Sequence, residues 1–328
     1  MDQADTLRKL MQNRAIQQDA ESRSFDDAAE SCKQVITISS GKGGVGKSIL
    51  TANIGAILAR SGLRVLLVDG DFGLANLDIL LGVHADTSLE QVLQGEASVQ
   101  DTVIGIEQNL WLLPASSGLS EARNWDPSAK TKLARLFDNF PWEMDVVLVD
   151  SGAGIQENVI SLHSPSFHSV VVLTPEPTSL TDAYGMIKTL RRKAGVNHVG
   201  IIVNQVTDAR EGRVTFQKLK DVAARFIDVE FEYLGHCQRD EKITQSVMKR
   251  KILLDLDARA PAVPCMELLA KRMKTSWLGW EEALSRGASE GSSDPKLLAQ
   301  MSAATSPGSP GSQANPRFWR TLLGEVSV

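Results

Sequence analysis

One eight-residue segment limits the fold of this chain more than any other feature. The sequence GKGGVGKS at residues 41–48 follows the apolar run VITIS at 35–39 and precedes the helical pattern ILTANIGAILAR at 49–60. It matches the template G-x-x-x-x-G-K-[ST] in the strand, loop and helix context that the template requires. Glycines let such a loop curl so that its N–H groups face phosphate oxygens, and the N-terminus of the following helix adds a positive dipole end. The segment therefore predicts a phosphate-binding loop.

Two side chains in this loop have the chemistry to hold a nucleotide. We expect Lys47 to reach the β and γ phosphates and the Ser48 hydroxyl to coordinate Mg²⁺. A glycine turn with a purely structural role does not need a lysine followed by a serine, so phosphate binding is favoured over that alternative. The predicted nucleotide-binding residues of the loop are Gly41, Lys42, Gly43, Gly44, Val45, Gly46, Lys47, Ser48 and Ile49.

Short apolar runs alternate with longer helical patterns along the chain. Runs this rich in Val, Ile and Leu are typical of strands that are buried on both faces of a parallel sheet. Their alternation with helices predicts an α/β fold: a doubly wound, mostly parallel sheet with helices on both faces and ligands at the carboxyl ends of the strands. After VITIS, the expected strands are RVLLVD at 64–69, LWLLP at 110–114, DVVLVD at 145–150, SVVVLTP at 169–175 and VGIIVN at 199–204.

A late segment has the periodicity of a helix. Apolar side chains recur there at steps of three or four, at Met266, Leu269, Met273, Trp277, Trp280 and Leu284. We expect this helix to close one face of the sheet, and a binding stripe is the alternative.

Composition and charge exclude several other classes of protein. Of the 328 residues, 42% are hydrophobic and 23% are charged, which is typical of a folded globular chain. No stretch approaches the roughly 20 apolar residues needed to span a bilayer, and the polar N-terminus lacks the apolar core of a secretory peptide, so a cytoplasmic protein is expected. The net charge of −5 argues against a nucleic-acid surface. The three cysteines and five histidines form no ligand pattern, so we expect neither disulfides nor a metal cage.

Acidic residues follow two of the expected strands. Asp69 and Asp71 lie in VDGDFGLANLD at 68–78, and Asp150 lies in VVLVDSGAGI at 146–155. Because the carboxyl ends of parallel strands share one edge of a sheet, we expect Asp150 at the phosphate end of the sheet. Acids at strand ends also serve as helix caps, which is the alternative for each one taken alone.

The loop with its second lysine, Lys42, resembles the deviant Walker A motif of the MinD/ParA/NifH class of ATPases. The resemblance implies ATP and Mg²⁺ as ligands and an ATP-dependent homodimer in which Lys42 reaches the nucleotide of the other subunit. Chemistry alone leaves open that Lys42 is a solvated loop charge. Residues 68–78 resemble switch I, which implies that Asp71 positions or activates the attacking water and that Asp69 supports the Mg²⁺ shell. Residues 146–155 resemble Walker B and switch II, which implies that Asp150 holds a magnesium-bound water.

Within this class the chain resembles the FlhG family, also called FleN or YlxH, which regulates the number and placement of flagella. Relatives that carry iron–sulfur clusters need cysteine motifs that are missing here, and the FlhG family differs from MinD by an N-terminal extension. The matching segments are DQADTLR at 2–8, SSGKGGVGKS at 39–48, DFGLANLD at 71–78, DSGAGI at 150–155, TPEPTSLTDAY at 174–184 and VNQV at 203–206.

This second resemblance implies further site residues. The N-terminal segment would activate the GTPase FlhF, through the motif residues Asp2, Gln3, Leu7 and Arg8. Asn204 would recognise adenine, and the segment around Arg239 and Asp240 would lie near the base. Family members usually have proline before that pair, whereas this chain has Gln238, so the resemblance is weaker at the base than at the phosphates.

The C-terminal sequence divides into a tether and a short amphipathic helix. Residues 301–316 are mostly Ser, Ala, Gly and Pro, which bury too little apolar surface to fold. In RFWRTLLGEV at 317–326, one face of a helix would carry the membrane-contacting side chains Phe318, Trp319, Leu322 and Leu323. This segment resembles the membrane-targeting helix of MinD and FlhG, which implies binding to inner-membrane lipid. Docking of the helix onto the body of the protein is the alternative.

These expectations combine into one hypothesis. A partner-activating segment (1–34) precedes an ATPase domain (35–285), a flexible linker (286–316) and a membrane-targeting helix (317–328). The chain would be an ATPase switch that hydrolyses ATP to ADP and phosphate and sits on the cytoplasmic face of the inner membrane, at a cell pole. Its partners would be FlhF and a flagellar transcription factor or basal-body protein, and nucleic acid is disfavoured. The alternatives are a MinD-type division-site regulator and a transcriptional anti-activator in which hydrolysis is incidental.

Overall fold

A computed structural model describes residues 32–277, apart from 72–74, 88–90, 92–95, 116–143 and 164–167. Three of the predicted segments therefore lie outside the described residues. They are the N-terminal segment with Asp2, Gln3, Leu7 and Arg8, the linker 286–316, and the C-terminal helix with Phe318, Trp319, Leu322 and Leu323. Trp280 and Leu284 of the expected late helix also lie outside them.

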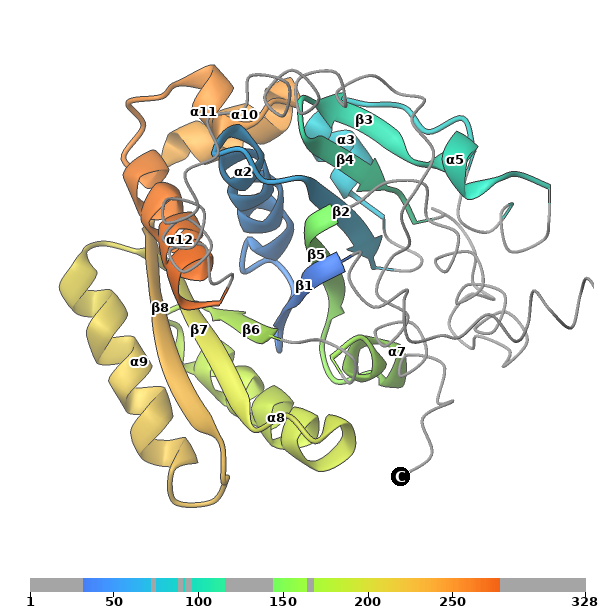
Figure 1. The fold of residues 1–328 in the computed structure, drawn as a ribbon. Helices are drawn as coiled ribbons and strands as arrows, with labels where there is room; N and C mark the ends of the chain where they lie inside the picture. Colours follow the sequence, from blue (N-terminus) through green and yellow to red (C-terminus); the bar gives the residue numbers. More distant parts are fainter. Residues whose placement is uncertain are drawn as a thin grey trace, which may run out of the picture.

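A single mixed sheet forms the centre of the described structure (Figure 1). It has eight strands in the order β3-β4-β2-β5-β1-β6-β7-β8, and only β3 runs antiparallel to its neighbour among them. All six strands expected from the sequence are present, so the doubly wound, mostly parallel sheet is confirmed. The strands are β1 (Cys32–Ser40), β2 (Val65–Gly70), β3 (Ile104–Glu107), β4 (Leu110–Leu113), β5 (Met144–Ala153), β6 (His168–Leu173), β7 (His198–Val206) and β8 (Glu230–Gln238).

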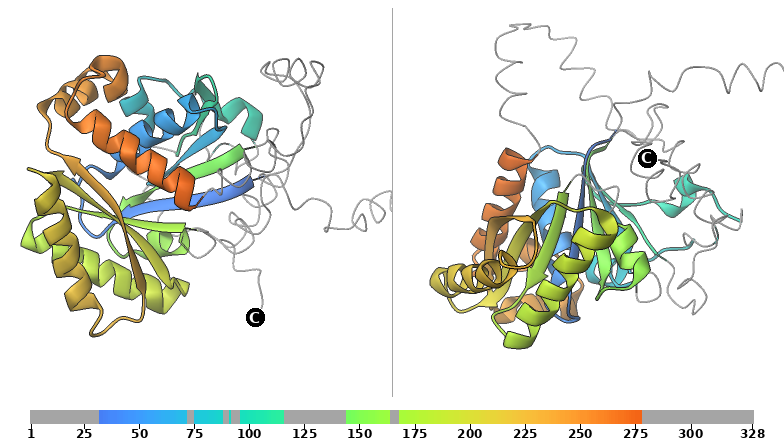
Figure 2. Two further views of the ribbon diagram at one scale, coloured as in Figure 1. Left: turned by 60° about the vertical axis from the view of Figure 1, so that its left-hand side comes forward. Right: turned by 90° about the horizontal axis from the view of Figure 1, so that it is seen from below.

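Helices cover both faces of the sheet, as the views in Figure 2 show. On one face, α2 (Lys47–Arg60) packs beside α12 (Ala262–Ser276), and α3 (Leu77–Leu81) contacts α2. On the other face lie α7 (Glu157–Ser161), α8 (Pro177–Ala194) and α9 (Ala209–Ala223). The remaining helices of the described chain are α5 (Val99–Thr102), α10 (Glu241–Lys249) and α11 (Leu253–Leu256).

Successive side chains of the central strands point to opposite faces of the sheet, so each face carries its own hydrophobic core. In β6, Val170 and Val172 belong to the core under α2 and α12, whereas Val171 and Leu173 belong to the core under α8 and α9. Each of these side chains is at most 1% exposed. This two-sided burial explains why the strands read as continuous apolar runs rather than as alternating ones.

The expected late helix is α12, and it closes one face of the sheet as expected. Met266, Leu269 and Met273 are buried in the core that α12 shares with α2. At the end of the helix, the Trp277 ring stacks on His168, with ring centroids 4.4 Å apart, and its Nε1 donates to Glu232 at 2.8 Å. Gly200 lies under that ring, where a Cβ would be 2.6 Å from Trp277. The contacts of Trp277 therefore tie the end of α12 to three neighbouring strands.

Two strands were not among the expected ones, and both lie at the edges of the sheet. β3 has the short sequence IGIE, and β8 has the sequence EFEYLGHCQ with charged residues in alternation. Gly235 has a φ of 146°, and the register between β7 and β8 shifts beside it. Arg272 of α12 donates to the carbonyl of Leu234 at 2.7 Å. Edge strands are partly solvated, which removes the apolar run that marks a central strand.

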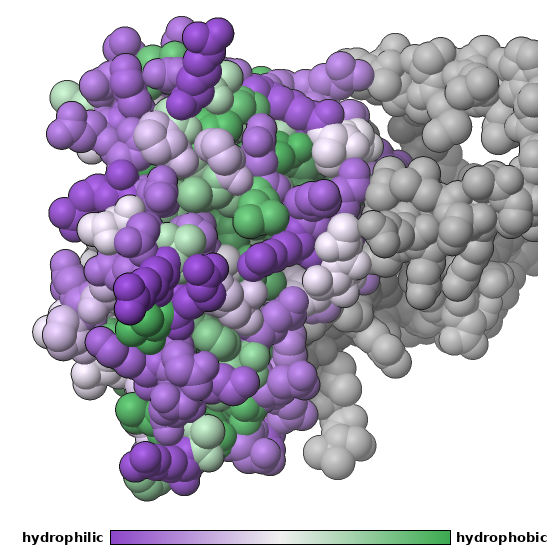
Figure 3. Space-filling view, turned by 90° about the vertical axis from the view of Figure 1, so that its left-hand side faces the viewer, coloured by the Kyte–Doolittle hydropathy of each residue, from purple (hydrophilic) through white to green (hydrophobic). Residues whose placement is uncertain are grey.

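The side of the molecule that carries α9, β8 and α12 is mainly hydrophilic, with small separate apolar patches (Figure 3). The exposed apolar side chains of α9 and the turn after it include Val214, Val222 and Phe226. No helix within the described ranges is long and apolar enough to cross a membrane.

Candidate functional site

The predicted phosphate loop joins the end of β1 to the start of α2. Gly44 and Gly46 adopt left-handed φ angles of 79° and 86°, which glycine reaches without steric cost. The first turn of α2 contains no acidic residue, and no side chain caps it. Its backbone N–H groups therefore suit an anionic ligand, which makes this helix end a candidate phosphate site.

The loop is packed so closely that two of its glycines have no room for a side chain. A Cβ on Gly41 would overlap the backbone of α8 at Asp182. A Cβ on Gly46 would come within 2.5 Å of the Asn204 side-chain amide. The loop is thus fixed between α8 and the carboxyl end of β7.

Lys47 lies under the loop and forms a buried ion pair with Asp150 of β5. Its Nζ donates to Asp150 Oδ1 at 2.8 Å, and the two side chains are 7% and 2% exposed. The Thr51 hydroxyl, one helical turn after Lys47, lies 3.5 Å from the same carboxylate oxygen. The structure therefore brings the predicted phosphate-binding lysine and the predicted magnesium-site carboxylate together at one point.

Asp69 lies beside Asp150 because β2 and β5 pair in register at these residues. Its carboxylate accepts hydrogen bonds from the backbone N–H groups of Asp71, Asn76 and Leu77, at 3.1, 2.9 and 3.1 Å. Burial and the charge of Asp150 raise the pKa of Asp69 to about 7, although the three backbone hydrogen bonds lower it. Two adjacent buried carboxylates favour a cation between them, so this pair is suited to a metal-bound nucleotide.

Asp71 lies above the start of the predicted switch II segment. A Cβ on Gly152 would be 3.1 Å from Asp71 Oδ1, so the carboxylate rests on that glycine. Burial and the charge of Asp150 raise the pKa of Asp71, while Lys47 opposes the shift. A partly buried carboxylate near the ammonium group of Lys47 can accept a hydrogen bond from a water molecule, and the water-positioning role requires such an acceptor.

Lys42 points away from this cluster. Its Nζ donates to Glu176 Oε2 at 2.7 Å and to Thr178 Oγ1 at 3.3 Å, at the N-terminus of α8. The ion pair is solvent-exposed, with 40% and 55% of the two side chains accessible. The hydrogen bond from Lys42 and the charges of Lys42 and Arg239 lower the pKa of Glu176. Solvent screens exposed pairs of this kind, so Lys42 can exchange partners at small cost.

The residues predicted to lie near adenine have mainly structural contacts in this structure. Asn204 is 5% exposed and donates to the Val45 carbonyl at 2.7 Å. Asp240 caps α10 by accepting from Lys242 N at 2.8 Å, and it accepts from Ala262 N at 3.0 Å. The backbone of Arg239 donates to the Val206 carbonyl at 2.9 Å. Contact of these side chains with a nucleotide base stays a prediction.

The donor set fits Mg²⁺. Mg²⁺ prefers oxygen ligands and is commonly held by one or two protein side chains together with substrate phosphates and water. Ser48 is the second residue of α2, and Asp150 and Asp69 supply carboxylate oxygens next to Lys47. Within the described part of the chain, no cluster of three or more His, Cys, Asp or Glu residues could form a protein-only metal cage. That combination is the one expected for a magnesium ion that arrives with a nucleotide.

Three polar residues at this site were missed by the sequence reading. Thr51 contacts Asp150, Glu176 pairs with Lys42, and Gln205 donates from Nε2 to the Gly44 carbonyl at 3.3 Å. The helical spacing of Thr51 from Lys47 could have indicated its position. The positions of Glu176 and Gln205 depend on strand order, so no local pattern marks them.

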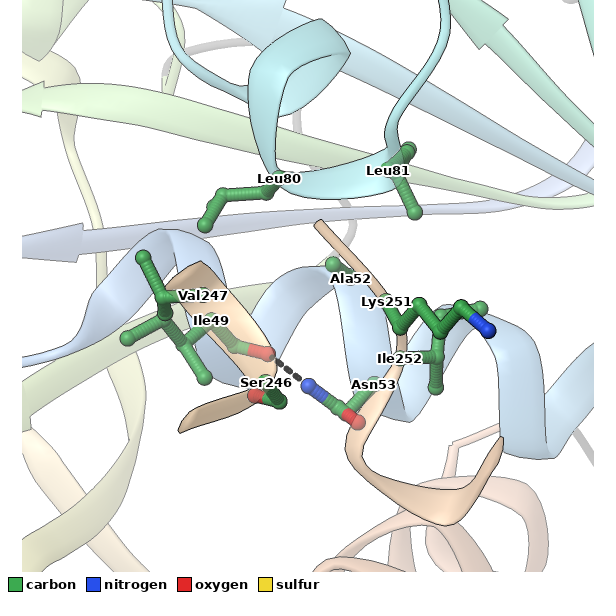
Figure 4. A pocket seen from close by; sticks show the side chains of 9 residues that line it. All are labelled: Ile49, Ala52, Asn53, Leu80, Leu81, Ser246, Val247, Lys251 and Ile252. Carbon is green, nitrogen blue, oxygen red and sulfur yellow. Dashed lines mark hydrogen bonds between the residues drawn. The ribbon is translucent and has the colours of Figure 1, made fainter. Parts of the chain in front are cut away.

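A hollow lies on the outer side of α2, between that helix, α3 and α10 (Figure 4). Asn53 is one of the residues that line it. Its Nδ2 donates to the Ile49 carbonyl at 2.8 Å, and its Oδ1 accepts from the Leu253 backbone N–H at 2.8 Å. Lys251 is the one charged residue among the described residues that line it. The lining residues are Ile49, Ala52, Asn53, Leu80, Leu81, Ser246, Val247, Lys251 and Ile252.

Comparison with known proteins agrees with this geometry. Residues 31–274 match the ParA family model, described as the NUBPL iron-transfer P-loop NTPase. The chain is 34% identical over 244 residues to the antiactivator FleN of Pseudomonas aeruginosa, covering 74% of this chain and 87% of that protein. It is 36% identical over 238 residues to the flagellum site-determining protein YlxH of Helicobacter pylori, covering 70% and 78% of the two chains.

Solved structures of similar fold include cell-division proteins. MinD in the MinC:MinD complex of Aquifex aeolicus has a TM-score of 0.61 and 29% identity, over 74% of this chain and 96% of that one. MinD of Pyrococcus horikoshii, complexed with Mg-ADP, has a TM-score of 0.62 and 26% identity, over 75% and 98% of the two chains. The magnesium nucleotide in that relative accords with the donor set described above.

Proposed function

Because the chain belongs to the ParA/MinD family of P-loop NTPases, and within it to the FleN and YlxH group, we propose that it is an ATP-hydrolysing switch that regulates the number and placement of flagella. The observation that carries the enzymatic part is the meeting of Lys47, Asp150 and Asp71 at the phosphate loop. The name of the Helicobacter pylori relative, a flagellum site-determining protein, supports the flagellar setting.

Each part of the site has a role in phosphoryl transfer from ATP to water. Lys47 and the first-turn N–H groups of α2 hold the phosphates and neutralise the charge that develops there. Asp71 orients the attacking water, and its raised pKa brings the carboxylate closer to the range useful for a base at neutral pH. Ser48, Asp150 and Asp69 would hold Mg²⁺, which supplies charge neutralisation at the phosphate oxygens. The products are ADP and phosphate.

Lys42 has a separate role in this proposal. It belongs to a deviant Walker A motif and crosses to the nucleotide of a second copy of the chain when ATP is bound. The exposure of its pair with Glu176 supports this role, because a weak surface contact does not hold the lysine in its own subunit. Nucleotide state then controls whether the protein is a monomer or a dimer.

Membrane binding is proposed to follow from dimerisation. A single tail helix gains little from the bilayer, since apolar burial of four or five side chains is nearly offset by the entropy of ordering the helix. Two tails held in one dimer bind more tightly through effective concentration. We therefore expect vesicle sedimentation with anionic lipid to be at least about tenfold greater with ATP and Mg²⁺ than with ADP.

Three variants make this experiment specific. The Lys42→Ala protein should bind nucleotide but lose the ATP-dependent sedimentation, whereas Trp319→Asp and a chain ending at Asn315 should lose sedimentation with either nucleotide. Equal sedimentation of the shortened and complete chains with ATP would show that the tail does not bind the membrane. ATP-independent light scattering by the unmodified protein would exclude the dimer switch.

The flagellar role predicts an effect on a second enzyme. A peptide of residues 1–20 should accelerate GTP hydrolysis by FlhF, because the N-terminal DQADTLR motif is proposed to complete or order its catalytic site. Gln3→Ala in the same peptide should remove the stimulation, while substitution of Gln18, outside the motif, should leave it in place. Absence of stimulation at saturating peptide would contradict this part of the proposal.

The description of one relative as an antiactivator supports a second candidate function. An antiactivator acts by binding a transcription factor, so the ATPase cycle could be incidental to regulation. A third candidate, division-site selection, is supported by a MinD of Synechocystis that is 34% identical over 226 residues. A deletion strain in which flagellar number is normal and division is misplaced would favour the third candidate over the first.

A further inference from the structure

The two buried carboxylates at the phosphate edge of the sheet are held by different kinds of donor. Asp69 accepts from three backbone N–H groups. The donors that the described part of the chain offers to Asp150 are both side chains. Lys47 Nζ donates to Asp150 Oδ1 at 2.8 Å, and the Thr51 hydroxyl lies 3.5 Å from the same oxygen. The direction of the Asp150 carboxylate therefore depends on groups that can move.

Thr51 is placed beside this carboxylate by the geometry of α2. It follows Lys47 by four residues, so the two side chains lie on the same face of the helix. Its side chain is completely buried, and its hydroxyl donates to the Lys47 carbonyl at 3.0 Å. That bond is common for a threonine within a helix, and the hydroxyl hydrogen stays free to rotate. The hydrogen can therefore turn from the carbonyl to Asp150 without a change of rotamer.

The Lys47 carbonyl is not left unpaired when the hydroxyl turns away. In an α-helix each carbonyl also accepts from the backbone N–H four residues further on, and for Lys47 that N–H belongs to Thr51. The two positions of the hydroxyl hydrogen thus differ mainly in what they do for Asp150. A donor at this place can respond to the state of the carboxylate while the helix stays as it is.

Nucleotide binding makes a second demand on the ammonium group of Lys47. In the proposed function this group holds the phosphates, yet in this structure it is paired with Asp150. Turning toward a phosphate weakens that pair. Asp150 is 2% exposed, so water has little access to replace the donor, and a buried acceptor that loses its donor is destabilising. The Thr51 hydroxyl already lies beside the same oxygen and can supply the missing hydrogen bond.

We propose that Thr51 is a positioning residue, which becomes the hydrogen-bond donor to Asp150 when Lys47 turns to the phosphates. This role rests on the proposed nucleotide binding and deepens it. The Thr51 hydroxyl holds the carboxylate in the direction in which it would face the Mg²⁺ of the nucleotide. Because Thr51 is buried under the loop, it acts on the ligand through Asp150 alone. Its hydroxyl should therefore matter for nucleotide with Mg²⁺ and not for nucleotide without it.

Calorimetry with ATP, in the presence and absence of Mg²⁺, tests this inference. Thr51→Val keeps the shape of the side chain and removes the donor, whereas Thr51→Ser keeps the donor and loses a methyl group. With Mg²⁺, we expect Thr51→Val to lower ATP affinity about 10- to 100-fold and Thr51→Ser to retain most of it. With EDTA in place of Mg²⁺, the three proteins should agree within about threefold. An equal fall without Mg²⁺ would overturn the proposal, and so would unchanged affinity with Mg²⁺.

A matched control separates the contact with Asp150 from the bond within the helix. Thr189 makes the same kind of bond on α8, where its hydroxyl donates to the Gly185 carbonyl at 2.8 Å. Thr189→Val should leave ATP affinity with Mg²⁺ unchanged. The ligand-free Thr51→Val protein should keep its thermal midpoint within a few degrees, because Lys47 still pairs with Asp150 there. A large fall of midpoint and affinity together, shared by Thr51→Ser, would assign Thr51 to packing and overturn the proposal.

The unmodified protein reports on the proposed function in the same experiment. If it does not bind ATP with Mg²⁺, the proposed function and the role of Thr51 both fail. If it binds and the Thr51→Val protein binds equally well, only the role of Thr51 fails. None of these measurements needs a dimer, a membrane or FlhF, so failure of the flagellar function would not affect them.

Discussion

Replacing Lys47 by methionine is expected to abolish nucleotide binding and to lower the free energy of unfolding by about 3–5 kcal/mol. The binding loss follows from removal of the charge that faces the phosphates. The stability loss follows from burial: Asp150 is 2% exposed, and its partner at 2.8 Å is the ammonium group that the substitution removes. Asp69 is its in-register neighbour, so the repulsion between two buried carboxylates would no longer be offset.

A double variant distinguishes the two effects. In Lys47→Met with Asp150→Asn, neither charge is left alone, so most of the lost stability should return in urea unfolding. Nucleotide binding should not return, because the phosphates still lack their lysine. A double variant as unstable as the single one would show that packing, and not the ion pair, sets the stability. Retention of ATP affinity in either variant would contradict the role of Lys47.

Replacing Asp71 by asparagine should slow ATP hydrolysis by about 10²- to 10⁴-fold and leave ATP affinity within a few-fold of the original value. The carboxylate rests on Gly152 beside the loop, where it can orient a water molecule, but it makes no hydrogen bond to the loop in the described structure. Phosphate release and calorimetry measure the two quantities. Asp86→Asn, at an exposed acid further along the chain, is the matched control and should change neither.

The same Asp71→Asn protein separates the two leading candidate functions. If hydrolysis resets the switch, the variant should accumulate as the ATP-bound dimer and disturb flagellar number in cells. If the chain acts only by binding a transcription factor, the variant should regulate normally. Unchanged phosphate release would remove Asp71 from the chemistry altogether.

The sequence predicted the parts of this fold whose signals are local. The strand VITIS, the glycine loop and the helix that begins at Lys47 are contiguous, so their order alone predicts a phosphate-binding loop, without any tertiary contact. The strands that end at Asp69 and Asp150 were recognisable because burial on both faces makes them continuously apolar. Their in-register pairing places Asp69 beside Asp150, which contacts Lys47.

The features that escaped prediction depend on the arrangement of elements in space. β8 alternates charged and apolar residues because it is an edge strand, and it was not recognised. Gln205 reaches the loop because β7 bends beside it, and Glu176 meets Lys42 only because α8 begins next to β1. The carboxylate of Asp240 joins the start of α10 to the start of α12, and its predicted place near the base stays a prediction. None of these relations has a period or a spacing in the sequence.

The irregular edge of the sheet at β8 also bears on the solubility of the protein. An open sheet offers backbone groups along its outer strand to any other extended chain, and such edges nucleate aggregation. Here the Arg272 side chain donates a hydrogen bond to the Leu234 carbonyl. The register of β8 shifts beside Gly235, which has a φ of 146°, and this irregularity interrupts the row of backbone groups with which an incoming strand would have to pair. Growth by strand addition is therefore blocked at this edge, even where copies of the chain are crowded together. At this edge, association between copies is left to side-chain surfaces, which can separate again.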